Sequence, residues 1–138
     1  MTADELARGY FIRARKRLVA LRALMQEEAY PDVVREAQEL VELVLKGMLR
    51  WVGIDPPKWH DVGPILVDQE SRFPEVVRSE IPVLAEISLR LRRDRETAFY
   101  GDIDLIPDRV FGREAAARAL CDAERVVEAT MHFTESKE

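Results

Sequence analysis

The sequence has one cysteine, Cys121, and two histidines, His60 and His132. A single cysteine excludes an intrachain disulfide and a zinc site built on cysteines. With only two histidines, a metal site would need carboxylates for most of its ligands, so we expect no metal site. Cys121 lies in a helical pattern, and we interpret it as a small buried side chain rather than a catalytic thiol.

Long apolar runs and standard catalytic signatures are also missing. No run approaches the roughly 20 residues that a membrane-spanning helix needs. The N-terminus is charged from Asp4 onward and lacks the apolar segment of a signal peptide, so we expect a cytoplasmic protein without membrane attachment. There is no glycine-rich phosphate loop, no His-Glu-x-x-His metal helix and no Gly-x-Ser-x-Gly elbow. We therefore expect no cofactor.

The chain of 138 residues is long enough for a substantial core, and we expect a single domain over residues 1–138. Apolar residues make up 47% and charged residues 34%, a mixture that excludes a disordered chain. The formal net charge of −5 argues against a whole-protein nucleic-acid footprint, because dedicated binders are basic overall. A local basic patch stays compatible with this charge.

The strongest helical pattern runs from Pro31 to Gly53. Proline is tolerated in a first helical turn, and glycine can adopt the left-handed conformation that ends a helix. The apolar residues of this segment form a stripe wider than one core face requires. The helix therefore is either the central member of a bundle or contacts a second chain as well as its own core.

The remaining chain predicts further helices and no strand of useful length. A first helix over residues 2–29 begins with a Thr2–Glu5 capping box. Its predicted core stripe, at spacings of three and four, is Leu6, Tyr10, Ala14, Leu18, Leu21 and Met25. We interpret the arginines on its other faces as solvated, with a functional basic surface as the alternative.

After a Pro-Pro connector, a short helix begins near His60-Asp61 and fades near Glu70. One helical turn is expected between residues 74 and 79, then a long helix over residues 80–100 capped by Ser79, and a last helix over residues 113–133. Short loops make neighbouring helices antiparallel. The predicted fold is all-α, an antiparallel up-and-down bundle of four long helices plus one short helix.

Two groups of residues resemble the HEPN domain family. The first is a row on the second helix followed by the start of the third: Gln38, Glu42, Lys46, Leu49, Gly53 and Trp59-His60-Asp61. The second lies in the later part of the chain: Arg93, Arg95, Tyr100, Gly101, Pro107 and the helix from Arg113. Their order and spacing are similar to a prokaryotic branch of the family over nearly the whole length.

The resemblance implies a helical bundle that usually dimerises, and it implies one of two roles. Many HEPN proteins are metal-independent ribonucleases that act as toxins or defence effectors. Their hallmark is an arginine followed, after four to six residues, by a histidine. Others have lost this motif and act as binding partners, often of a minimal nucleotidyltransferase.

This sequence departs from the hallmark because Tyr100 stands where the histidine would follow Arg95. A tyrosine with an ordinary pKa near 10 is a poor proton acceptor at neutral pH. The leading hypothesis is a nucleotide- or nucleic-acid-associated HEPN module without the catalytic histidine, paired with a nucleotidyltransferase-type partner in a toxin–antitoxin or defence setting. The alternatives are a ribonuclease that uses Arg95 and Tyr100, and a non-catalytic dimeric adaptor.

Site candidates follow from this hypothesis. The catalytic candidates are Arg95, Tyr100 and Asp102, and the nucleotide- or phosphate-binding candidates are Arg92, Arg93, Arg95 and Lys46. The arginines fit a phosphate-binding cluster and surface ion pairs within one helix about equally well. A self-satisfied polar stripe likewise explains the Gln38–Glu42–Lys46 row. A literal arginine–histidine match, Arg125 with His132, falls in the last helix, and we interpret it as chance.

Overall fold

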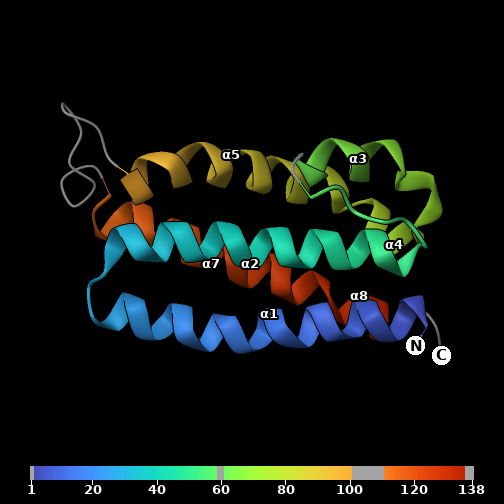
Figure 1. The fold of residues 1–138 in the computed structure, drawn as a ribbon, viewed down its shortest axis with the longest axis horizontal. Helices are drawn as coiled ribbons and strands as arrows, with labels where there is room; N and C mark the ends of the chain where they lie inside the picture. Colours follow the sequence, from blue (N-terminus) through green and yellow to red (C-terminus); the bar gives the residue numbers. More distant parts are fainter. Residues whose placement is uncertain (1, 59–60, 101–110, 136–138) are drawn as a thin grey trace.

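The computed structural model describes residues 2–58, 61–100 and 111–135, with only the backbone described at residues 95–100 and 134–135. The described part of the chain is helical, without strands. In chain order the helices are α1 (Ala3–Gln26), α2 (Tyr30–Trp51), α3 (Val62–Asp68), the 3-10 turn η1 (Glu70–Arg72), α4 (Glu75–Arg78), α5 (Ile81–Tyr100), α7 (Arg113–Ala129) and α8 (Met131–Glu135). This arrangement confirms the predicted all-α bundle (Figure 1). None of the described helices is both long and apolar enough to span a bilayer.

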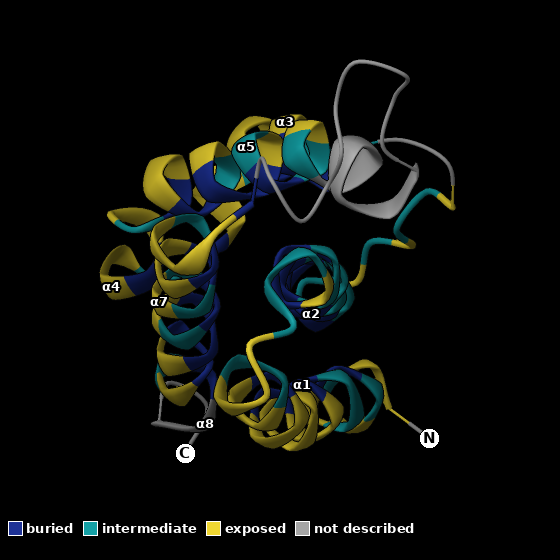
Figure 2. Cartoon of the chain, turned by 90° about the vertical axis from the view of Figure 1, so that its left-hand side faces the viewer, coloured by how far each residue is buried: buried dark blue, intermediate teal, exposed yellow. Residues whose placement is uncertain are grey.

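Helix α2 is the centre of the bundle. Viewed along its axis, it lies with α1 on one side, α5 and α3 on the opposite side and α7 on a third (Figure 2). Its fully buried apolar residues are Val33, Val34, Ala37, Leu40, Val41, Val44, Leu45, Met48 and Leu49. Contacts with four helices of its own chain therefore account for the wide apolar stripe seen in the sequence.

Helix ends follow the local signals in the sequence. The Thr2 hydroxyl accepts a hydrogen bond from the Glu5 backbone N–H, and the Glu5 carboxylate accepts one from the Thr2 N–H, each at 3.1 Å. This capping box satisfies two donors that a helix start leaves unpaired. Asp61 caps α3 by accepting from the Gly63 N–H at 3.1 Å. Gly53, with φ of 80°, ends the turn after α2 as predicted.

The buried face of α1 is rotated by one position in its first half relative to the prediction. Ala7 and Phe11 are buried, whereas the predicted core residues Leu6 and Tyr10 are only half-buried. Phe11 packs 5.2 Å, centroid to centroid, from Phe133 of α8. Trp51 and Phe73 contact the same ring at 5.2 and 6.2 Å. This aromatic cluster joins distant parts of the chain, and it draws Phe11 into the core.

The prediction of one continuous last helix over residues 113–133 is wrong in one respect. In the structure this segment is interrupted at Thr130. Helix α7 ends at Ala129 and α8 begins at Met131. The buried Thr130 hydroxyl donates to the Val127 carbonyl at 2.6 Å and accepts from Arg15 of α1 at 3.2 Å. The side chain thus bonds the preceding turn and a second helix at the point where α7 ends.

Two smaller predictions are also corrected. Cys121 is exposed rather than buried. The buried face of α7 contains Ala119 and Ala123, and two residues of separation along a helix turn Cys121 by about 200° away from either. The Ser79 hydroxyl donates back to the Val76 carbonyl of α4 at 3.1 Å, and α5 begins at Ile81. Ser79 therefore closes the end of α4.

Candidate functional site

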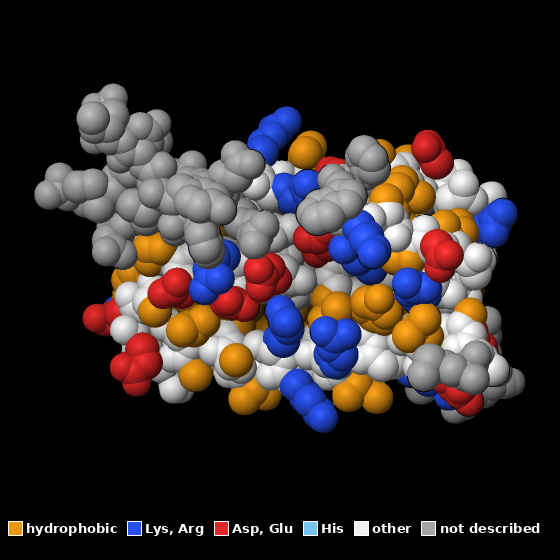
Figure 3. Space-filling model, viewed as in Figure 1, with side chains coloured by type: hydrophobic (Ala, Val, Ile, Leu, Met, Phe, Trp, Pro, Cys, Tyr) orange, Lys and Arg blue, Asp and Glu red, His pale blue; other side chains and the backbone are white. Residues whose placement is uncertain are grey.

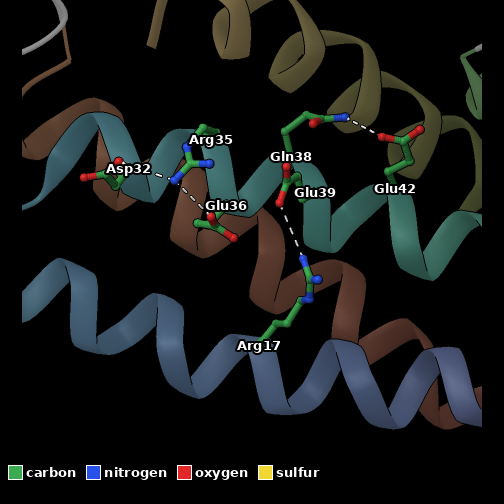
Figure 4. Close-up of polar contacts among 7 residues, drawn as sticks. All are labelled: Arg17, Asp32, Arg35, Glu36, Gln38, Glu39 and Glu42. Carbon is green, nitrogen blue, oxygen red and sulfur yellow. Dashed lines mark hydrogen bonds and ion pairs between the residues drawn. The ribbon is translucent and has the colours of Figure 1, made fainter. Parts of the chain in front are cut away.

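The polar row of α2 starts at Gln38, whose side chain is 2% exposed. Its amide Nε2 donates to Glu42 Oε2 at 2.9 Å, along the side of α2 that faces α5 (Figure 4). The amide oxygen Oε1 is buried and has no hydrogen-bond partner. A buried acceptor without a partner costs free energy.

The second carboxylate oxygen of Glu42 contacts two cations. Lys46 Nζ lies 3.4 Å from Glu42 Oε1, and Nη1 of Arg92, from α5, lies 3.6 Å from the same oxygen. We call Gln38, Glu42, Lys46 and Arg92 the Glu42 cluster. The Gln–Glu–Lys row predicted on one helix is therefore joined to a second helix by an arginine that the sequence singled out separately.

The Glu42 cluster combines a fixed carboxylate with cations that keep donors to spare. A lysine ammonium has three N–H donors and a guanidinium five, and Glu42 occupies a minority of them. The side chains of Lys46 and Arg92 are 23% and 36% exposed, so their remaining N–H groups reach solvent. Such a pair can donate to an anionic oxygen such as that of a phosphate.

A surface pocket of about 280 Å³ adjoins the cluster on the side of α1. Its lining is Arg17, Glu39, Glu42, Leu43 and Lys46. Arg17 reaches across from α1 and its Nη1 lies 3.5 Å from Glu39 Oε2 (Figure 4). Glu42 and Lys46 therefore line an open hollow between α1 and α2 and also face α5.

Further cations follow the seam between α1 and α2. The guanidinium carbons of Arg13 and Arg50 each lie 5.8 Å from the ring centroid of Tyr10. A hydrogen bond with the Tyr10 side chain is the main cause that raises the pKa of Arg50 above its usual value. The Asp55 carboxylate, whose Oδ1 lies 2.8 Å from Arg50 Nη1, raises this pKa further. Arg50 therefore stays charged at every accessible pH. The sequence contained a signal for this group of cations. Arg13 and Arg17 are four positions apart on α1, and Lys46 and Arg50 are four positions apart on α2. The sequence analysis did not connect the two pairs.

Of the predicted phosphate-binding residues, the structure brings Lys46 and Arg92 together and leaves Arg93 exposed. Arg95 and Tyr100 lie in the last turns of α5, where only the backbone is described, and Asp102 falls outside the described residues. Arg90 pairs with Asp122 of α7. Arg90 and Arg92 thus connect α5 to other helices, to α7 and α2 respectively.

His132, which forms the chance sequence match with Arg125, contacts Glu80 instead. His132 Nε2 lies 3.5 Å from Glu80 Oε2, near the start of α5, while Arg125 is exposed on α7.

Within the residues that the structure describes, no group of three histidine, cysteine or acidic side chains is placed to hold a metal ion. Asp61 has a second role that the sequence did not reveal, because it also accepts from the buried Ser88 hydroxyl at 3.4 Å.

Comparison with protein families matches the HEPN domain model to residues 7–133, nearly the whole chain. The chain belongs to the HEPN family. HEPN domains commonly dimerise, and the membership supports a nucleotide- or RNA-associated module. Searches among curated proteins and among solved structures gave no match.

Proposed function

We propose that residues 1–138 form a single HEPN domain that binds a nucleotide or RNA phosphate at the Glu42 cluster. The observation that carries the proposal is the meeting of Lys46 and Arg92 on one Glu42 oxygen, at 3.4 and 3.6 Å. Glu42 holds the two cations close together at the surface, and a phosphate can bridge their free donors. The exposed Arg93 lies next in sequence to Arg92 and adds positive charge to the same end of α5.

In this proposal the protein binds without the usual catalytic histidine, since Tyr100 follows Arg95 at the motif position. It acts as a homodimer and pairs with a minimal nucleotidyltransferase-type partner in a toxin–antitoxin or defence setting. Family membership supports this role, because HEPN domains that lack the motif serve as such partners. The carboxylate of Glu42 then organises the ligand-binding cations and takes no part in proton transfer.

The test is a titration with ATP and with a short labelled RNA at about 50 and 200 mM salt, because phosphate contacts weaken as salt rises. Arg92→Ala and Lys46→Ala should each weaken binding about tenfold, or ~1.4 kcal/mol. Arg22→Ala is the matched control, because Arg22 is also a surface arginine paired with a carboxylate, at 2.9 Å from Glu124. Equal affinity of Arg92→Ala and Arg22→Ala would show that the cluster is purely structural.

Two other functions remain as competing hypotheses. A metal-independent ribonuclease would use Arg95 to hold phosphate and Tyr100 as an acid, with Asp102 nearby in sequence. A non-catalytic dimeric adaptor would bind neither ATP nor RNA at low salt, and its Arg92 would serve only to join α5 to α2.

A further inference from the structure

The outward side of α2 has a regular order of charge. Its half-buried and exposed residues include a stripe at alternating spacings of four and three: Asp32, Glu36, Glu39, Leu43, Lys46 and Arg50. We call this set the outer stripe. Residues at these spacings share one helix face, the pattern of a seam between two paired helices. The described helices α1, α5 and α7 pack on the other sides of α2, as the view along its axis shows (Figure 2).

Charge changes sign once along the outer stripe. The three residues before Leu43 are acidic and the two after it are basic. The space-filling view shows the same order, with acidic side chains gathered over the beginning of α2 and lysine and arginine side chains over its middle and second half (Figure 3). Each charge of the outer stripe also has an ion-pair partner within the chain. Arg35 contacts Asp32 and Glu36 at 3.6 and 3.2 Å, and Arg17 of α1 contacts Glu39 at 3.5 Å. Glu42 contacts Lys46 at 3.4 Å and Asp55 contacts Arg50 at 2.8 Å, so the contrast along the stripe is reduced.

This order is self-complementary under one symmetry. A two-fold axis in the plane of the face and perpendicular to α2 makes the helices of two copies antiparallel. With the axis beside Val41, Asp32 lies opposite Arg50, Glu36 opposite Lys46, and Glu39 opposite Leu43. A two-fold axis parallel to α2 would instead place each charge opposite its own copy, which repels.

We propose that the outer stripe is the contact between two copies of this chain, packed with their α2 helices antiparallel about an axis beside Val41. The occupant is a second copy because a single face holds both halves of the charge pattern, and an antiparallel copy presents the opposite order. This inference rests on the homodimer of the proposed function, and it adds that the two copies contact each other through the outer stripe. Leu43 of each copy lies beside the axis and supplies the apolar centre of the contact.

The proposed interface also makes the ligand site composite. Glu42 is adjacent to Leu43 in α2 and therefore lies beside the axis in both copies. Two Glu42 clusters then meet on the side of α5, with two lysines and two arginines around two carboxylates. The paired cluster has twice the cationic donors of a single copy, which suits a ligand with more than one phosphate.

The experiment uses charge reversal on the full chain, with mass measured by light scattering and association by sedimentation. One variant, Asp32→Lys with Glu36→Lys, makes the outer stripe mainly basic, and another, Lys46→Glu with Arg50→Glu, makes it mainly acidic. Each alone should raise the dimer dissociation constant about 100-fold, because like charges then face each other. An equimolar mixture should form a heterodimer, since every reversed charge then meets its opposite.

Matched controls lie on α7, away from the stripe. Glu114→Lys with Glu128→Lys and Arg118→Glu with Arg125→Glu change the net charge by the same amounts at exposed positions, and both should dimerise like the unaltered chain. Recovery on mixing also shows that both stripe variants are folded. Three results would overturn the inference: an unaltered chain that is monomeric at about 1 mM, stripe variants that stay dimeric, or stripe variants that fail to associate when mixed. Nucleotide titration of the Asp32→Lys with Glu36→Lys variant, which leaves Glu42, Lys46 and Arg92 unchanged, tests the proposed function separately.

Discussion

Gly47 and Phe11 lie in contact where α1 packs tightly against α2. A Cβ atom added to Gly47 would lie 2.8 Å from Cε1 of Phe11 and 2.9 Å from Cβ of Tyr10. Glycine is therefore required by the space between the two helices, since the residue sits in the interior of α2. The close approach lets the Phe11 ring reach Phe133 in the aromatic cluster.

We predict that Gly47→Ala lowers the free energy of unfolding by about 1–3 kcal/mol, the usual cost of overpacking a core. The control is Gly9→Ala in α1, where no atom lies within 4 Å of the added Cβ. Because alanine favours the helix, that variant should gain about 0.5–1 kcal/mol. Urea unfolding followed by circular dichroism measures both, and equal shifts of the two variants would contradict the close approach of α1 and α2.

The Glu42 cluster makes a prediction about stability that is independent of any ligand. Glu42→Ala removes the acceptor of the buried Gln38 amide and leaves Lys46 and Arg92 without their carboxylate. We expect a loss of about 1–3 kcal/mol, because a buried donor without a partner costs its full desolvation. Adding Gln38→Leu to Glu42→Ala should recover part of this loss.

A double-mutant cycle of these two positions measures the coupling. A coupling free energy of about 0.5 kcal/mol or more is expected for residues in direct contact. Additive effects would show that Gln38 gains nothing from Glu42. Glu128→Ala, at an exposed position of α7, is the control for loss of a surface carboxylate.

The choice between binding module and ribonuclease depends on the end of α5. If Arg95 and Tyr100 catalyse RNA cleavage, Arg95→Ala and Tyr100→Phe should each reduce the rate by about tenfold or more, since an acid or a phosphate-binding group typically contributes at least that much. If the chain is the binding module proposed above, purified protein gives no cleavage. Weak cleavage that persists unchanged in both variants would identify a contaminating nuclease and exclude the ribonuclease hypothesis as stated.

Local signals predicted the parts of the fold that depend on neighbouring residues. The Thr2–Glu5 capping box and the Gly53 turn each involve groups within three residues of one another, and both were predicted from the sequence. The short helix was predicted to begin near His60-Asp61, and Asp61 caps its start. The central place of α2 was also indicated, because its apolar residues surround most of the helix. Helix type and order therefore follow from periodicity and capping alone.

Features that depend on distant residues could not be read in the same way. Phe11 replaces Tyr10 in the core because Gly47 and Phe133, 36 and 122 positions later in the chain, make room for its ring and contact it. Thr130 interrupts the last helix, and its hydroxyl also meets Arg15 from the opposite end of the chain. The Arg92–Glu42 contact likewise needs the antiparallel packing of α5 on α2. The residues of these contacts could each be seen in the sequence, but which residue contacts which could not be predicted from it.

The aromatic cluster also determines when the chain can fold. Phe133 of α8 contacts Phe11 of α1, Trp51 of α2 and Phe73 between η1 and α4, so residues from distant parts of the chain close one core together. During synthesis, α1 and α2 are complete long before residue 133 leaves the ribosome. Until then the rings of Phe11 and Trp51 lack their contact with Phe133. Contacts between residues so far apart are made late and slow the folding of a helical protein. We therefore expect the nascent chain to expose an aromatic surface, of the kind that chaperones bind, until α8 has been made.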